Sequence, residues 1–305
     1  MEFDLFHVIN KSFDYFVFSL IFAFSLLALW LPKSFTISHS TFAKTLLFIA
    51  ILTTLATASI DLLFRTAILA DVAPMEAFSF IPKVLDKSDY GFLWQLRIAL
   101  WGVVFTVALW LIKKPSQTKL PLIILIATTL SALLMSATGH AGENGVWTLA
   151  NINNWLHLIG IAMWGGCVVL YALIVLPALI RDTLSEKIAS VSTTLSSIAT
   201  VALALVVITG IINSWRQLQS IEALFNTPYG EILLLKLTFV AIMMGIGTFN
   251  RFILVPKIEK QYRSSNKDLN TAHRFQRILR IDSLLFITIL VAAAILGMQI
   301  PPAHM

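Results

Sequence analysis

The chain has 305 residues, of which 58% are hydrophobic and only 12% are charged, and its mean hydropathy is +0.84. Soluble domains carry about 25% charged residues, so this composition excludes an ordinary soluble domain. No nucleic-acid-binding motif accompanies the net charge of +6, and the single cysteine excludes an intrachain disulfide. We therefore expect an all-α, polytopic membrane protein that has no nucleic-acid partner.

Long apolar segments follow one another along the whole chain. A membrane-spanning helix needs about 20 mostly apolar residues, and eight segments meet this requirement. We expect spans near residues 13–31, 42–64, 91–112, 119–138, 153–179, 191–213, 230–254 and 281–300. No basic region precedes the first segment and no small-residue cleavage site follows it, so we expect it to stay in the protein as a helix.

Lysine and arginine residues are distributed unequally between alternate loops. Fifteen of these cations lie on one side and five on the other. Because such cations favour cytoplasmic loops, we expect both termini on the outer side of the membrane. The basic run between residues 251 and 280 would then lie at the inner surface, where it can contact anionic membrane lipid.

Two residues in the first half of the chain could interact with a cation at the outer side. His7 lies close to the N-terminus, and Asp61 ends a polar stripe that includes Thr54 and Thr57. Arg65 follows Asp61 by one helical turn, so a structural pair of these two residues is the favoured interpretation. An acidic way-station for a cation or a proton is the alternative.

Two histidines lie near the outer ends of consecutive spans. His140 ends the fourth span, and His157 lies one turn inside the fifth, on one face with Trp164 and Tyr171. A short loop joins the two helices, so we expect the imidazoles to approach each other. Two imidazoles suit copper in either oxidation state. A solvated interfacial His140 and a hydrogen-bonded core His157 remain alternatives.

Further donors are predicted at the same depth. Met298 lies at the outer end of the eighth span, and His304 precedes the C-terminal residue. A thioether favours Cu(I), while an imidazole accepts either oxidation state. We predict that Met298, His304 and His7 join the first two histidines in binding a copper ion of undetermined oxidation state. The alternative for the terminal residues is disorder.

Charged residues also occur in the last two spans. Lys236 lies inside the seventh span, where it could extend to the surface or point inward and pair with Asp61, Asp14 or a backbone carbonyl. Arg251 and Asp282 lie at the inner ends of the seventh and eighth spans, and we expect them to form an ion pair. These residues either line an ion path or form structural pairs.

A series of short motifs runs through residues 137–256. It consists of Gly139-His140, His157, Trp164-Gly165-Gly166, Thr209-Gly210, Thr227-Pro228-Tyr229-Gly230, and Lys236 followed by Asn250-Arg251. The series resembles the CopD copper-resistance family of bacterial inner-membrane proteins, whereas residues 1–136 match that family only by their helix pattern. We therefore divide the chain into N-terminal membrane helices, 1–136, and a CopD-like membrane domain, 137–305.

The resemblance implies a multi-pass protein of the bacterial inner membrane, so the outer side, where the cation count places both termini, would be the periplasm. It also implies copper import or copper resistance, and a periplasmic CopC-like copper-binding partner on a separate chain. A haem-binding electron-transfer protein and a non-transporting accessory subunit for such a partner are the alternatives. The sequence shows no nucleophile–base pair, phosphate-binding loop or paired carboxylates, so we do not expect an enzyme.

Overall fold

The structure of the chain is a computed structural model, and it describes residues 5–31, 37, 40–114, 117, 119–181, 185–263 and 269–304. At four of these positions it describes the backbone but not the side chain, namely Ser185, Glu186, Tyr262 and His304. All regular structure in the described ranges is helical, which confirms the predicted all-α fold.

Within those ranges, eight helical segments are long and apolar enough to cross a membrane, as predicted. Six of them are single helices: α1 (Leu5–Trp30), α2 (Thr41–Ala70), α4 (Asp89–Lys113), α5 (Lys119–Ala137), α9 (Ser185–Leu218) and α13 (Asn270–Leu296). The fifth span in chain order consists of α6 (Leu149–Ile161), η4 (Ala162–Gly166), α7 (Cys167–Leu170), η5 (Tyr171–Val175) and α8 (Leu176–Arg181). The seventh consists of α11 (Pro228–Phe249), η6 (Asn250–Leu254) and α12 (Val255–Arg263). The connections contain η2 (Ala77–Phe80), α3 (Ile81–Lys87), η3 (His140–Gly142), α10 (Glu222–Asn226) and η7 (Pro302–His304).

Several of these helices extend beyond the apolar runs that identify them. α2 continues to Ala70, and α13 begins at Asn270 rather than near residue 281. The additional residues of α13 include glutamine and arginine, which are good helix formers. Hydrophobicity therefore locates the part of a helix inside the membrane, while the helix itself continues into the polar region.

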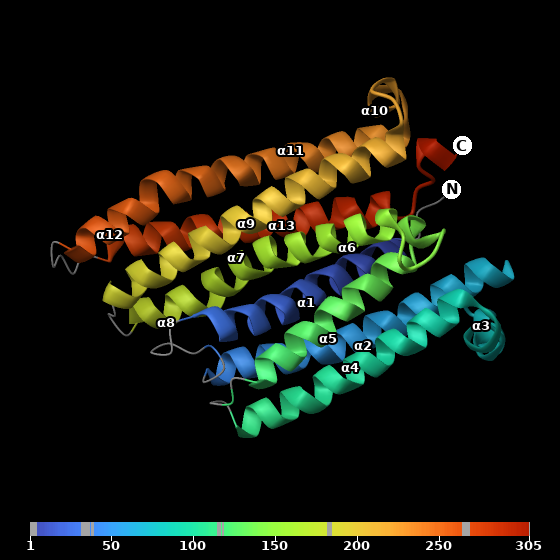
Figure 1. The fold of residues 1–305 in the computed structure, drawn as a ribbon, viewed down its shortest axis with the longest axis horizontal. Helices are drawn as coiled ribbons and strands as arrows, with labels where there is room; N and C mark the ends of the chain where they lie inside the picture. The colour runs from blue at the N-terminus through green and yellow to red at the C-terminus, as the bar shows by residue number, and fades with distance from the viewer. Residues whose placement is uncertain are drawn as a thin grey trace.

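The spans form a bundle in which both chain termini lie at the same end (Figure 1). An even number of spans returns the chain to the end where it began. The short helices α3 and α10 and the connection between α5 and α6 lie at this end too, whereas α12 lies at the opposite end (Figure 1). The end that carries the termini is called the terminal end below.

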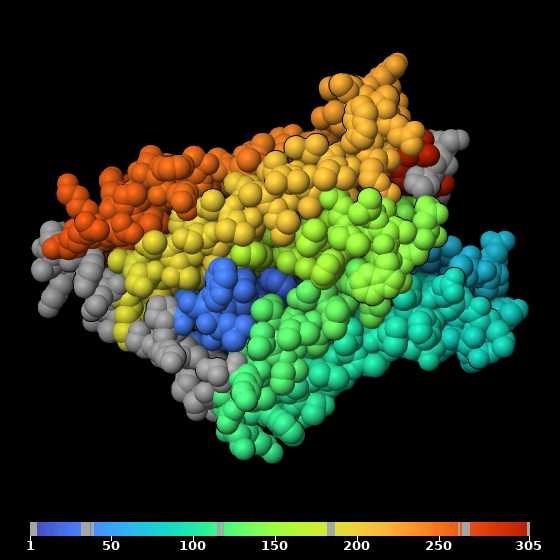
Figure 2. Space-filling view, in the orientation of Figure 1, coloured from blue at the N-terminus to red at the C-terminus, as the bar shows by residue number. Residues whose placement is uncertain are grey.

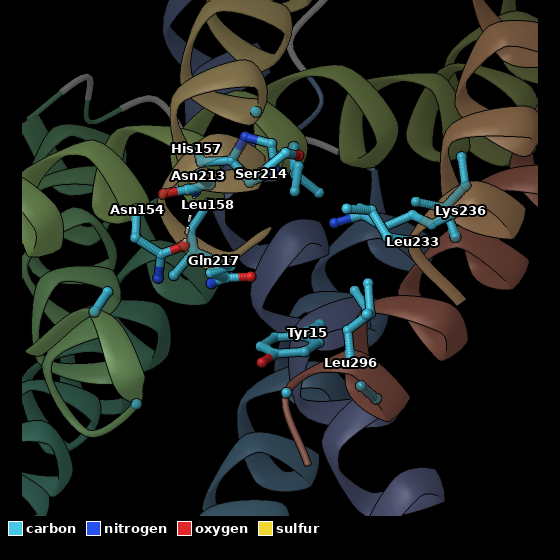
Figure 3. Close-up of a pocket in the computed structure, with 18 of the residues that line it drawn as sticks. Tyr15, Asn154, His157, Leu158, Asn213, Ser214, Gln217, Leu233, Lys236 and Leu296 are labelled. Carbon is cyan, nitrogen blue, oxygen red and sulfur yellow. Dashed lines mark hydrogen bonds between the residues drawn. The ribbon is translucent and has the colours of Figure 1, made fainter. Parts of the chain in front are cut away.

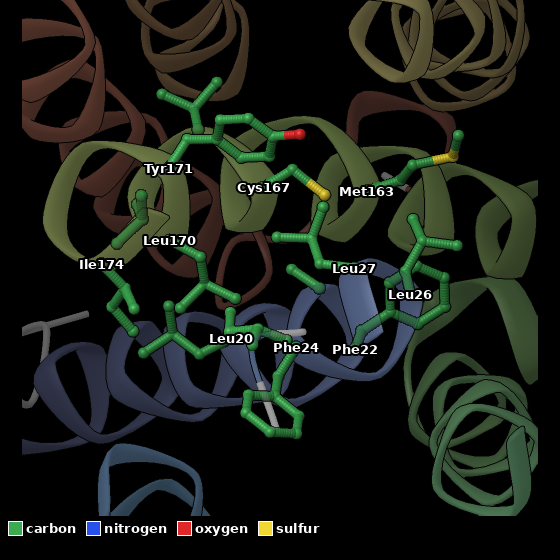
Figure 4. Packing of buried hydrophobic residues seen from close by; sticks show 14 of the residues in the cluster. Leu20, Phe22, Phe24, Leu26, Leu27, Met163, Cys167, Leu170, Tyr171 and Ile174 are labelled. Atoms are coloured by element: carbon green, nitrogen blue, oxygen red, sulfur yellow. The ribbon is translucent and has the colours of Figure 1, made fainter. Parts of the chain in front are cut away.

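The first span occupies the centre of the bundle. Phe18, Ile21 and Leu27 of α1 are almost completely buried, and α1 contacts α2, α5, η4, α7 and α13. Figure 4 shows that α1 packs along the segment containing α7 and η5. Gly166 permits this packing, because a Cβ atom there would collide with the backbone oxygen of Ser19.

One hydrophobic core connects the two predicted parts of the chain. Its buried residues come from α1, α2, α4 and α5 in the first part and from α7, α9 and α13 in the second. Figure 2 shows α4 and α5 on one side of the molecule and α9, α11 and α12 on the other. The division between residues 136 and 137 stays a prediction, and the site described next draws residues from both parts.

Candidate functional site

A cavity of about 760 Å³ lies at the terminal end of the bundle, and all eight spans contribute to its lining. Protein sites for small molecules typically have volumes of about 300–1,000 Å³. The predicted donors His7, His140, His157 and Met298 all line this cavity, and so do Asp61 and Lys236. The structure therefore brings together residues from distant parts of the chain, while the side chain of His304 lies outside the described part.

His157 is 9% exposed and is held by the neighbouring helix α9. Its Nδ1 lies 2.9 Å from Oγ1 of Thr209, and the same hydroxyl donates to the backbone oxygen of Leu205 at 2.6 Å. Since the hydroxyl hydrogen is used for Leu205, Nδ1–H of the imidazole is the donor to Thr209. This arrangement leaves Nε2 with an available lone pair, as a metal-binding imidazole requires.

The Thr209-Gly210 motif thus has a structural explanation at His157. Thr209 orients the ring, and Gly210 leaves space for it, since a Cβ atom at Gly210 would lie 3.2 Å from Cε1 of His157. The alternative of a hydrogen-bonded core histidine describes Nδ1 correctly. It does not account for the exposure of His157 to the cavity, which this residue also lines.

His140 lies in η3, at the cavity rim between α5 and α6. Its Nδ1 lies 2.8 Å from Oε1 of Glu143, and its side chain is 36% exposed. His140 and His157 therefore share one cavity, but each has its own neighbouring partner. No three His, Cys, Asp or Glu side chains in the described ranges form a ready-made metal cluster, so direct contact between the two imidazoles stays a prediction.

A network of amide side chains forms the wall between α5, α6 and α9. Asn154 donates to Oγ of Ser136 at 2.9 Å, and Asn213 donates to Oδ1 of Asn154 at 3.1 Å. Asn153 in turn donates to Asn213 at 2.8 Å. The sequence interpretation missed the asparagines of this network, although Asn151, Asn153 and Asn154 fall within four positions near the start of an apolar span and were a usable signal.

Asp61 lies on the opposite side of the cavity and pairs with α1. Its Oδ1 lies 3.2 Å from Nζ of Lys11 and 3.5 Å from Nε2 of His7, and Tyr90 donates to its Oδ2 at 3.2 Å. The predicted Asp61–Arg65 pair is wrong. Asp61 faces α1 in the bundle interior, whereas the guanidinium group of Arg65 lies over the Tyr90 ring, 5.7 Å from its centroid.

A second ion pair is buried between α1 and α4. Nη2 of Arg97 donates to both carboxylate oxygens of Asp14 at 2.9 and 2.8 Å, and Thr57 donates to Asp14 at 3.2 Å. Asp14 is 1% exposed and Arg97 is 3% exposed. Asp14 therefore has a basic partner from α4, and Asp61 has one from α1. One interpretation had expected Lys236 to pair with one of these two aspartates, and it pairs with neither.

Lys236 projects into the cavity instead. Figure 3 shows its amino group extending from α11 into the space opposite His157, Ser214 and Gln217. The motif before it sets its position, because Thr227 caps α11 by accepting a hydrogen bond from the Gly230 amide at 3.0 Å. Among the described residues, Lys236 has neither an ion pair nor a side-chain hydrogen bond.

The predicted Arg251–Asp282 pair is also wrong. Nη1 of Arg251 donates to Thr200 at 2.7 Å and to Ser196 at 3.0 Å, both on α9. Asp282 is 1% exposed inside the bundle, and its Oδ1 has no hydrogen-bond partner. The two side chains separate because Arg251 lies on the outer face of η6 while Asp282 points inward. Neither residue lines the cavity.

Both halves of the chain match family models for copper resistance proteins. Residues 189–296 match copper resistance protein D, and residues 3–150 match the copper resistance protein D-like, N-terminal domain. The chain belongs to the copper resistance protein D family. The predicted resemblance is thereby confirmed, and the N-terminal match adds residues that helix pattern alone had not identified as specific to the family.

Two curated relatives are similar to the chain. Copper resistance protein D of Pseudomonas syringae pv. tomato is 28% identical over 195 residues, which are 61% of this chain and 61% of that protein. Inner membrane protein YebZ of Escherichia coli (strain K12) is 26% identical over 178 residues, 57% of this chain and 58% of that protein. The matches thus span about three fifths of these relatives. No solved structure matches the chain.

These findings also bear on location. The family membership and the spans identify a multi-pass membrane protein, and the Escherichia coli relative is named an inner membrane protein, as the predicted location requires. The cavity combines the two matched regions, since its lining residues His7 and His140 belong to the N-terminal match while Gly210 and Lys236 belong to the copper resistance protein D match.

Proposed function

We propose that this member of the copper resistance protein D family takes up copper through the cavity at its terminal end, for import or delivery at the inner membrane. One observation carries the proposal: four side chains that can bind copper, from α1, η3, α6 and the residues after α13, line one cavity. The relative from Pseudomonas syringae is named for copper resistance. The proposal assigns the protein no enzymatic activity.

The orientation follows from the cations. Counted by the alternate loops expected from the sequence, fifteen lysine and arginine residues lie on the side away from the termini, against five on the side of the termini. Cation-rich loops favour the cytoplasm, so we place the termini and the cavity mouth on the periplasmic side. Copper would then arrive from the periplasm, where a CopC-like protein on a separate chain is the proposed partner.

The donors have different roles in this proposal. Nε2 of His157 is the fixed ligand, because Thr209 holds the opposite ring nitrogen. His140 at the rim and His7 beside Asp61 provide further imidazoles, and the Met298 thioether favours Cu(I). His304 stays a predicted ligand, since its side chain is not described.

Copper binding by the purified protein tests the proposal. We expect the stoichiometry or affinity to fall in the His140→Ala/His157→Ala double variant. His273→Ala is the matched control, because this exposed histidine bonds the backbone oxygen of Leu269 at the start of α13, far from the cavity lining. Unchanged copper binding in the double variant would refute the histidine site.

The same preparation separates the competing functions. A Soret absorption band would support the haem-binding alternative, for which His157 is the histidine clearly inside a span. Reconstitution into liposomes that contain a copper reporter separates transport from an accessory role. Import predicts a reporter signal that depends on the protein, whereas an accessory subunit predicts copper or partner binding without that signal.

A further inference from the structure

Lys236 gives the cavity a second chemical property, which copper binding does not use. An ammonium group has three donors and no lone pair, so it cannot bind a metal ion and repels one. In the described residues it also has no anionic partner, although it lies inside a bilayer-length helix. A charge that is partly removed from water without a partner is costly, and an anionic ligand would reduce that cost.

The other charged groups of the cavity do not compensate Lys236. Asp61 pairs with Lys11, and Glu143 lies 2.8 Å from His140. Arg65 lies over the ring of Tyr90 on the side of α2 and α4. The position beside Lys236 is therefore suited to an anion that the protein itself does not supply.

The wall next to Lys236 is apolar. It is formed by side chains of α11 and α13, namely Leu233, Leu237, Val240, Phe286, Ile289 and Leu290. An inorganic anion has no apolar surface to bury against this wall, and the cavity of about 760 Å³ is far larger than a small ion needs. A hydrocarbon chain, by contrast, is stabilised by burial against these side chains.

The depth of Lys236 agrees with a membrane ligand. The span from Pro228 to Gln261 has 34 residues, so the helix is about 51 Å long. If it stands upright and centred in the membrane, it extends about 10 Å beyond the hydrocarbon layer of about 30 Å at each end. Lys236 follows Pro228 by eight residues, or about 12 Å along the axis. Its amino group therefore lies near the boundary between lipid headgroups and hydrocarbon.

We propose that the cavity binds an amphipathic anion from the membrane. Its anionic headgroup pairs with Lys236, and its hydrocarbon chain lies along the apolar wall of α11 and α13. A phospholipid phosphate and a fatty-acid carboxylate share this chemistry. The inference goes beyond copper uptake, since the site is measured on copper-free protein and its failure would leave the histidine proposal intact.

Lipid titration of the purified, delipidated, copper-free protein tests this site. The probes are dioleoylphosphatidylglycerol, oleate and zwitterionic dioleoylphosphatidylcholine. We expect Lys236→Gln to weaken binding of the anionic probe by about tenfold or more, because it removes a charge-assisted pair. Lys236→Arg should retain binding. Lys83→Gln is the matched control, an exposed lysine on α3 at the terminal end that does not line the cavity.

The outcomes are distinguishable. A selective loss for phosphatidylglycerol identifies a phospholipid, and a selective loss for oleate identifies a fatty acid. Equal binding of both anions by wild type and Lys236→Gln, or an equal loss in Lys83→Gln, overturns the proposal. Native mass spectrometry of the wild-type protein before delipidation needs no variant: one anionic lipid should remain bound, and retention of the zwitterionic lipid in its place would contradict the assignment.

Discussion

The hydrogen bond between Thr209 and His157 offers a sharp test of the site. Thr209→Val keeps the shape of the side chain but removes the oxygen that accepts from Nδ1–H. The ring then loses the contact that fixes its tautomer and orientation. Partners of this kind typically change metal affinity by about 10–100-fold when they are removed, which corresponds to about 1.4–2.7 kcal/mol of binding free energy.

The assay is a competition titration of Cu(I) against a chelator, with wild-type protein and Thr209→Val compared. Thr238→Val is the control, because this exposed threonine of α11 bonds the backbone oxygen of Leu234 and does not line the cavity. We expect Thr209→Val to bind copper more weakly than the wild type, and Thr238→Val to bind copper with the wild-type affinity. Equal copper affinity in all three proteins would refute the role of Thr209 as the residue that orients the ligand.

Further predictions concern packing and charge. Arg97→Met should lower the free energy of unfolding in detergent by about 3–5 kcal/mol, because it leaves the Asp14 charge buried without its partner; the Asp14→Asn/Arg97→Met double variant should recover part of this loss. Gly166→Ala should lower it by about 1–3 kcal/mol, since the new methyl group collides with α1. Gly210→Ala should weaken copper binding by displacing the His157 ring while the helical content in circular dichroism stays unchanged.

The membrane-spanning helices were predictable because one physical requirement determines where they form. A backbone in hydrocarbon must satisfy its own hydrogen bonds, so every apolar run of sufficient length becomes a helix. The location of His140 and His157 at the same end of the bundle was also predictable, since a short loop joins the ends of two consecutive antiparallel helices. The ends of α2 and α13 were not, because polar helix formers extend these helices beyond the apolar runs.

The partners of the charged residues could not be read from spacing. Asp61 has Arg65 one turn away, yet it pairs with Lys11, which is fifty positions distant in the chain. Arg251 similarly bonds α9 rather than Asp282. Such choices depend on which helices become neighbours and how each rotates about its axis. The position of α1 in the centre of the bundle decides the partner of Asp61, and the apolar sequence of α1 gives no signal of it.

X-ray absorption spectroscopy of the copper-loaded protein tests the copper site most directly. If His157 is the fixed ligand, the wild-type spectrum contains imidazole scattering at a copper–nitrogen distance, and His157→Ala reduces it while His273→Ala leaves it unchanged. An identical spectrum for wild type and His157→Ala would contradict the account, because the copper would then be bound outside the cavity or without the histidine that Thr209 orients.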